Sequence, residues 1–202
     1  MQTIFSYEPD KKALNVNKSE IYRYMGYTKG ASASEMVDSE VDEILTKVLE
    51  HSTPKVCYKR FALDFSDGID FGGFCIQSKD LAVNLDGCKD AVIFAATIGI
   101  YTDMQIRKEA VLSPHRACIF QAVGAAVVEA VCDDFNEWLK EAEEKAGNAL
   151  KPRFSPGYGD VSLEVQKDIF RELNCAKIAG ITLTDSLLMV PEKSVTAIIG
   201  IR

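Results

Sequence analysis

The stretch from His115 to Lys145 constrains the fold more than any other part of this sequence. Its spacing predicts one long helix that is apolar on nearly all sides as far as Val131 and charged beyond Asp133. A helix that is hydrophobic all round is a buried helix, so its first half must lie in the core. The rest of the chain therefore has to supply packing partners on several sides of it.

Residue spacing before this stretch predicts two helices and a hairpin. Asn17 is placed as the N-cap of a short helix, and Ser34 opens a longer amphipathic helix. β-Branched and aromatic residues then fill residues 56–65 and 69–76 on either side of Ser66-Asp67-Gly68. This pattern predicts that the two segments pair as a hairpin.

The remaining elements alternate irregularly between strand and helix. Thr102 and Asp103 are placed as the N-cap of a helix that runs toward Val111. The other predicted elements are an apolar strand over 90–99, a helix over 163–173, and strand-like segments near Ile181 and from Val195 to Ile201. The order predicts one α+β domain over residues 1–202, with residues 1–50 as a helical N-terminal appendage.

Charge and composition exclude some classes of partner. The 202 residues include 23 Lys and Arg against 30 Asp and Glu, which gives a net charge of -7 with no basic cluster. Proteins that bind nucleic acid or coat an anionic membrane need such a cluster, so neither partner is expected. The N-terminus has no basic start, and no apolar run approaches the ~20 residues of a membrane span. We therefore expect a cytoplasmic protein.

The cysteines and histidines offer no metal site and no catalytic base. None of the six cysteines forms a C-x-x-C pair, so buried thiols in a reducing compartment are expected in place of a zinc or iron-sulfur site. Only His51 and His115 could serve as an imidazole base. The glycine-rich dinucleotide and phosphate-binding motifs do not occur. No catalytic residue and no metal ligand is predicted.

The loop Arg153-Phe154-Ser155-Pro156-Gly157-Tyr158-Gly159-Asp160 is the strongest candidate for a binding site. Its prolines and glycines bend the backbone and leave N–H and C=O groups that can meet a flat polar ligand such as adenine. Arg153 suits bidentate recognition of a carboxylate, and Tyr158 adds an aromatic face with a hydroxyl group. The alternative is a tight turn that only faces solvent.

Glu129 is unusual because it stands in the apolar half of the long helix. Helical spacing places Glu129, Asp133 and Glu137 on one face, which can simply be a solvated acidic stripe. If this face is instead turned toward the Arg153 loop, the site offers both a cation and a carboxylate.

Several segments resemble one known family. Arg153-Phe-Ser-Pro-Gly-Tyr158 resembles the R-x-x-x-G-Y signature of the activation domain of cobalamin-dependent methionine synthase. The similar segments occur in the same order and cover roughly residues 90–201; they are Phe94–Gly99, the helix with Glu129, the helix with Gln166-Lys167, Gly180–Ser186 and Met189–Val195.

The resemblance implies a C-shaped α+β domain around a twisted antiparallel sheet, with S-adenosylmethionine bound by the Arg153-Phe154-Ser155-Pro156-Gly157-Tyr158 loop and Glu129. Arg153 would hold the methionine carboxylate, and Glu129 the ammonium or the ribose hydroxyls. Loop backbone near Ser155 and Gly157 would read the adenine edges, and Tyr158 would shape the mouth of the site.

The resemblance also implies partners. No Asp-x-His-x-x-Gly cobalamin signature occurs in this chain, so cobalamin would arrive on a separate methionine synthase or other corrinoid protein, and the electron from a flavodoxin or ferredoxin-type donor. The leading hypothesis is a module that supports reductive remethylation of cob(II)alamin on that protein. The alternative is a non-catalytic S-adenosylmethionine-binding or protein-interaction module.

Overall fold

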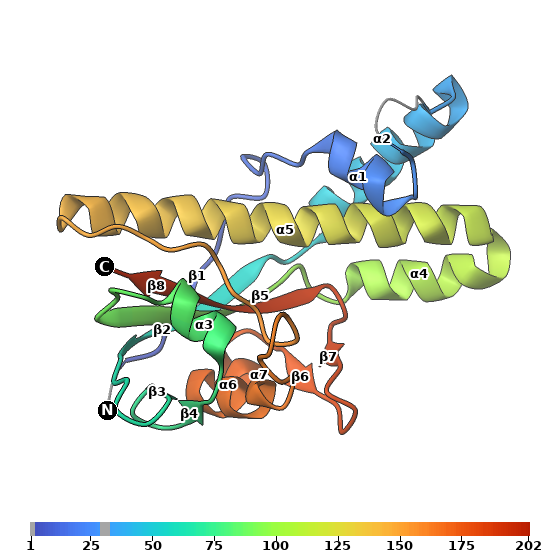
Figure 1. The fold of residues 1–202 in the computed structure, drawn as a ribbon. Helices are drawn as coiled ribbons and strands as arrows, with labels where there is room; N and C mark the ends of the chain where they lie inside the picture. Colours follow the sequence, from blue (N-terminus) through green and yellow to red (C-terminus); the bar gives the residue numbers. More distant parts are fainter. Residues whose placement is uncertain (1–2, 29–32) are drawn as a thin grey trace.

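In the computed structural model, which describes residues 3–28 and 33–202, a four-stranded antiparallel sheet lies between two layers of helices (Figure 1). The predicted α+β class is confirmed. Across the sheet the strands are β1 (Phe5–Tyr7), β2 (Lys55–Ala62), β5 (Asp90–Thr97) and β8 (Ser194–Ile201).

The helix α5 (Pro114–Lys145) crosses one face of the sheet, as Figure 1 shows. Its apolar half is buried as predicted, with Ile119, Val123 and Val127 fully enclosed. Other helices surround α5 because this half has no polar side to leave in water. They are α1 (Lys18–Tyr24), α2 (Glu35–His51) and α4 (Tyr101–Leu112).

Short elements cover the opposite face of the sheet (Figure 1). They are the helices α3 (Lys79–Asn84), α6 (Val165–Leu173) and α7 (Cys175–Ile178), the hairpin of β3 (Ile69–Asp70) with β4 (Cys75–Ile76), and the hairpin of β6 (Thr182–Leu183) with β7 (Met189–Val190). The central strand β5 is therefore buried on both sides, with Phe94 in the α5 cluster and Ile93 in the other. This explains its unbroken apolar sequence.

The predicted hairpin of residues 56–65 with 69–76 is wrong. β2 pairs along its whole length with β5, from Lys55 opposite Thr97 to Ala62 opposite Asp90. Only an isolated bridge between Asp64 and Asp70 links the two predicted segments, and β3 pairs with β4 instead. Pairing with a buried central strand covers more apolar surface than a local hairpin, so the long-range partner prevails.

The N-caps of α1 and α2 are confirmed, because the Asn17 and Ser34 side chains each accept a hydrogen bond from the first turn. The predicted cap of α4 is wrong. That helix begins at Tyr101 after Ile100 and has no side-chain cap. Asp103 instead accepts a hydrogen bond of 2.7 Å from the backbone N–H of Glu192, which ties α4 to the segment before β8.

The first 50 residues contain a strand as well as helices, since β1 pairs with β2 at the edge of the sheet. Ile21 of α1 and Val41 of α2 are fully buried in the cluster around α5. The sequence pattern did not indicate β1, because three residues are too few to show an alternation.

The other edge of the sheet is covered by the segment that follows α5. The backbone N–H of Lys151 donates to the Gly200 carbonyl over 2.9 Å. Phe154 donates to the Ile198 carbonyl over 2.9 Å and accepts from the Ile198 N–H over 2.8 Å. Residues 149–154 thus run antiparallel to β8 and occupy its outer hydrogen-bonding groups.

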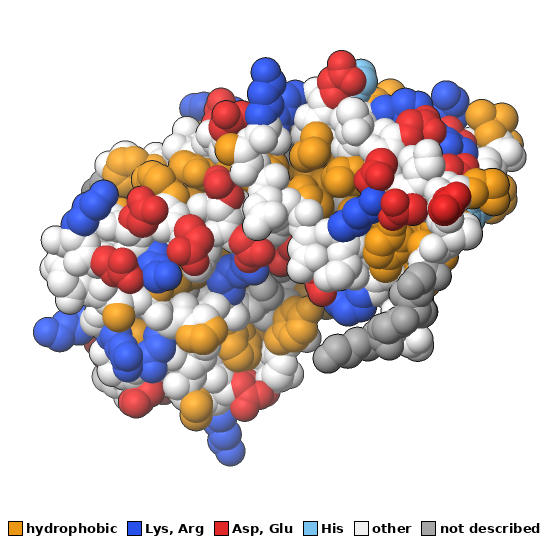
Figure 2. Space-filling model, turned by 90° about the horizontal axis from the view of Figure 1, so that it is seen from above, with side chains coloured by type: hydrophobic (Ala, Val, Ile, Leu, Met, Phe, Trp, Pro, Cys, Tyr) orange, Lys and Arg blue, Asp and Glu red, His pale blue; other side chains and the backbone are white. Residues whose placement is uncertain are grey.

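The face of the molecule seen from above carries acidic and basic side chains interspersed, with hydrophobic side chains between them (Figure 2). None of the helices among residues 3–28 and 33–202 is long and apolar enough to cross a membrane.

Candidate functional site

The edge segment places Arg153 toward α5. Side chains alternate along an extended segment, and Phe154 packs on the cluster opposite α5, so Arg153 next to it faces the helix. Its Nη2 lies 3.3 Å from Oε2 of Glu129 and 2.8 Å from Oδ1 of Asp133. The acidic face of α5 is therefore turned toward the loop and is not a stripe that meets only water.

Burial differs among these three charges. The Arg153 side chain is 25% exposed, whereas Glu129 is 44% and Asp133 71% exposed. The Nη1 atom of Arg153 is buried and has no hydrogen-bond partner among the residues described. A guanidinium group has five N–H donors, so Arg153 retains donors for a further acceptor.

A cavity of about 390 Å³ lies between the loop and α5. Five of the seven residues predicted for the site line it: Glu129, Arg153, Phe154, Ser155 and Tyr158. Its wall is completed by Val195 and Ala197 of β8, which sequence reasoning did not select. Tyr158 adds an aromatic side chain to the wall, so the cavity combines a ring with a cation and a carboxylate.

The two other predicted residues shape the loop and do not line the cavity. Pro156 is buried, and Gly157 adopts a φ of +90°, which favours glycine. The Gly157 N–H donates to the Val161 carbonyl over 2.8 Å and is thus engaged inside the turn. The Gly157 N–H group is therefore not free to donate to adenine, as was predicted for the backbone near this residue.

Asp160 fixes the end of the loop to α3. Its carboxylate accepts hydrogen bonds from the Ser78 hydroxyl and from the backbone N–H of Lys79, the latter over 2.8 Å. These bonds hold the pKa of Asp160 below its ordinary value. The loop is therefore held at both ends, by β8 at Phe154 and by α3 at Asp160.

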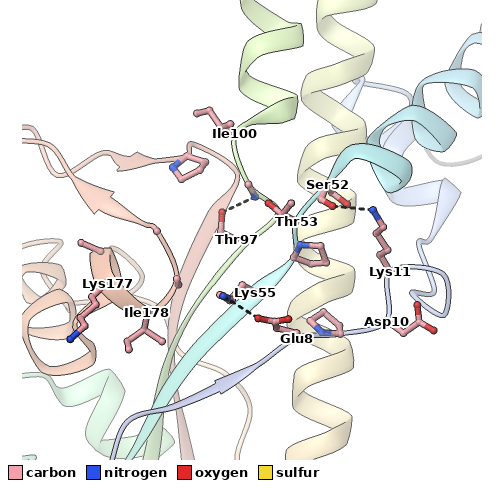
Figure 3. A pocket seen from close by; sticks show the side chains of 17 residues that line it. Glu8, Asp10, Lys11, Ser52, Thr53, Lys55, Thr97, Ile100, Lys177 and Ile178 are labelled. Atoms are coloured by element: carbon pink, nitrogen blue, oxygen red, sulfur yellow. Dashed lines mark hydrogen bonds and ion pairs between the residues drawn. The ribbon is translucent and has the colours of Figure 1, made fainter.

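A larger cavity of about 740 Å³ lies at the end of the sheet (Figure 3). Lys177 and Ile178 of α7 stand on one side of it, and the segment after β1 stands on the other. Lys55 pairs with Glu8 over 3.0 Å, and Lys11 donates to the carbonyls of Glu50 and Ser52. None of the seven predicted site residues lines it.

Neither His51 nor His115 is among the residues that line these two cavities. His51 stacks on Tyr101, and His115 pairs with Glu40 over 2.9 Å. Among the cysteines, Cys75 and Cys118 are exposed and the other four are buried. No group of three or more His, Cys, Asp or Glu side chains within the described ranges is arranged to hold a metal ion.

Comparison with known proteins gives a likeness in fold. No family model matches the sequence, and no curated protein matches it. Among solved structures, a crystal structure of the MetH reactivation domain bound to AdoHcy superposes with a TM-score of 0.66 at 15% sequence identity. The match covers 98% of this chain and 78% of that one. The chain has the fold of the MetH reactivation domain, as the resemblance to the methionine synthase activation domain implied.

Proposed function

We propose that this protein binds S-adenosylmethionine in the cavity beside Arg153 and supports reductive remethylation of cob(II)alamin carried by a separate protein. The observation that carries the proposal is the Arg153 guanidinium, which is held by Glu129 and Asp133 at the wall of a cavity with aromatic surface. The likeness in fold to a domain bound to AdoHcy supports the ligand class.

The residues of the cavity suit the chemical groups of this ligand. The Arg153 side chain is 25% exposed and its guanidinium has more N–H donors than the bonds to Glu129 and Asp133 use, so the ligand's carboxylate can accept a charge-assisted bond from it. Glu129 can accept from the ammonium or from the ribose hydroxyls. Tyr158 offers a ring face for adenine, and 390 Å³ falls within the range of small-molecule sites.

The role proposed for the protein is positioning. S-adenosylmethionine supplies an activated methyl group, and the corrinoid partner, a cobalamin-dependent methionine synthase or a related protein, supplies the cobalt that receives it. A flavodoxin or ferredoxin-type donor would provide the electron. No acid or base is needed for this transfer, which agrees with a cavity lined by binding groups. Alignment of two reactants can lower a barrier by ~7 to 11 kcal/mol.

Calorimetry with S-adenosylmethionine tests the binding step. Arg153→Ala should weaken binding by about 1.5 to 3 kcal/mol, the usual worth of a hydrogen bond to a charged group. Glu129→Gln should weaken it by less, because Glu129 is partly exposed. The control is Arg171→Ala, which removes an exposed arginine of α6 that pairs with Asp168 over 2.7 Å. If Arg153→Ala binds S-adenosylmethionine as tightly as wild type does, Arg153 does not contact the ligand and the loop has only a structural role.

The transfer step needs a second assay. The protein should produce methylcobalamin when mixed with the cob(II)alamin-bearing partner, S-adenosylmethionine and a low-potential one-electron donor, and omission of any component should stop the reaction. If S-adenosylmethionine binds tightly but no corrinoid partner is ever methylated, the non-catalytic binding module is the correct function.

A further inference from the structure

Tyr158 has little packing of its own at the candidate site. It is 69% exposed, so few contacts fix its ring. Gly157 and Gly159 flank it with φ values of +90° and +54°, and glycine has no side chain that could brace the backbone on either side. The place of Tyr158 at the wall of the cavity beside Arg153 therefore depends on how the backbone of the loop is held.

The loop before Tyr158 is tied to the sheet. Phe154 exchanges two backbone hydrogen bonds with Ile198 of β8. The Tyr158 N–H then donates to the Ser155 carbonyl over 3.2 Å, which closes a turn. These bonds fix the Arg153 end of the loop. They do not fix the direction in which the turn itself points.

Asp160 holds the far end of the loop. Its Oδ1 accepts from the Ser78 hydroxyl and from the Asp80 N–H, the latter over 3.3 Å, and its Oδ2 accepts from the Lys79 N–H over 2.8 Å. Ser78, the N-cap of α3, also accepts from the N–H of Leu81, which is fully buried. Asp160 thus connects the loop to a helix that is anchored in the core.

Val161 is a second anchor, and it differs from Asp160 in kind. It is 3% exposed in the cluster opposite α5, and its N–H donates to the Tyr158 carbonyl over 3.1 Å. Apolar burial has no preferred direction, whereas hydrogen bonds do. Val161 therefore keeps the turn against the core, and the bonds of Asp160 to α3 set its orientation.

We propose that Asp160 is a positioning residue of the candidate site: through its hydrogen bonds to α3 it orients the turn so that the Tyr158 ring faces the adenine of the ligand. This inference rests on the proposed function, because it takes S-adenosylmethionine as the ligand and Tyr158 as a contact of adenine. Asp160 is not among the residues that line the cavity beside Arg153, so it acts through Tyr158 and not by touching the ligand.

Asp160→Ala in three backgrounds tests this role by calorimetry. In the wild-type chain it should weaken S-adenosylmethionine about three- to tenfold, the change expected for loss of one aromatic contact. In Tyr158→Ala the same substitution should have no further effect, because the ring that Asp160 positions is already absent. In Arg153→Ala it should weaken binding by the same factor as in the wild-type chain, since the two ends of the loop are held separately.

Two further variants separate positioning from general loosening of the fold. Asp160→Asn keeps one carbonyl oxygen for the donors of α3 and should bind S-adenosylmethionine more tightly than Asp160→Ala does. Asp64→Ala is the matched control, because Asp64 is also an exposed carboxylate that accepts from a backbone N–H, that of Ser66 over 2.8 Å, and it does not line the cavity beside Arg153. It should bind the ligand as wild type does.

The inference is wrong, while the proposed function stands, if Asp160→Ala leaves the affinity unchanged or weakens it equally in the wild-type chain and in Tyr158→Ala. It is also wrong if Tyr158→Ala binds as tightly as wild type, because Asp160 then has no ligand contact to position. A wild-type protein that binds no S-adenosylmethionine would contradict the proposed function itself.

Discussion

The cavity beside Arg153 and the cavity at the end of the sheet differ in size and in how their charges are satisfied. The cavity at the sheet end has almost twice the volume, 740 against 390 Å³. Yet Lys55 and Lys11 there already bind a carboxylate and backbone carbonyls. In the smaller cavity Arg153 keeps a buried nitrogen without a partner. The smaller cavity has Arg153, Glu129 and Tyr158 together at its wall, which suits a charged nucleoside ligand, so we take it and not the larger cavity as the candidate site.

The largest expected effect comes from blocking each cavity with the same side chain. Val195→Trp would fill the cavity beside Arg153, because Val195 lines it, and should weaken S-adenosylmethionine about 100-fold or more, which corresponds to about 2.7 kcal/mol. Ala176→Trp would fill the cavity at the sheet end and should leave the affinity unchanged. Calorimetry on both variants, with folding checked by circular dichroism, tests the comparison. If instead Ala176→Trp weakens binding and Val195→Trp does not, S-adenosylmethionine binds in the larger cavity.

A smaller effect is expected where the loop meets α3. Gly159 has a φ of +54°, and a Cβ atom there would lie 2.3 Å from Oδ2 of Asp80. Gly159→Ala should therefore lower the free energy of unfolding by about 1 to 2 kcal/mol and also weaken S-adenosylmethionine, as the loop shifts. Denaturant unfolding and calorimetry measure the two effects.

The control for this change is Gly26→Ala, at a φ of +88° with open space around the added atom. It carries a similar backbone cost but lies outside the lining of both cavities, so only the unfolding free energy should fall. Weakened ligand binding in Gly26→Ala would show that general destabilisation, and not the position of the loop, controls affinity.

The smallest effect concerns pH and the sheet end. Asp103 is 2% exposed, and burial raises its pKa above the ordinary value. The folded protein thus holds this proton more tightly than the unfolded chain, so ionisation of Asp103 lowers stability as pH rises from about 3.9 through the raised pKa. Asp103→Asn removes this cost and should slightly raise the melting temperature at neutral pH.

The gain should shrink as pH falls and disappear below the ordinary carboxyl pKa, which thermal unfolding at several pH values can show. Because Asp103 lines neither cavity, the affinity for S-adenosylmethionine should stay the same. An increase in melting temperature that becomes larger at low pH would contradict the raised pKa of Asp103. A change in the affinity for S-adenosylmethionine would show that Asp103 and the Arg153 site influence each other.

Local chemistry was sufficient to predict much of the candidate site. Arg153 and Glu129 stand out in the sequence because each is a charge in an unusual setting, and the structure places them 3.3 Å apart. Val195 and Ala197 could not be selected, because β8 is buried on both faces and its sequence gives no sign of which residues turn toward α5. Asp133 was noticed only as part of the acidic face.

The elements of the fold were predicted where their signals are local. The long helix α5 and the caps Asn17 and Ser34 depend on neighbouring residues, and all three are as predicted. The partner of β2 depends on β5, some 30 positions further along the chain, and a local turn signal at Gly68 suggested the wrong pairing. Sheet partners are chosen by total burial, which a single segment does not reveal.

The backbone bonds between residues 149–154 and β8 also bear on aggregation. A sheet edge with free N–H and C=O groups is a template on which another chain can add a strand. Here the peptide that carries Arg153 occupies that edge at Ile198 and Gly200. Substitutions that released the loop would therefore remove the ligand contact and would also expose a sheet edge to which another chain could add a strand. The sequence of this loop is thus more constrained than that of an ordinary surface loop.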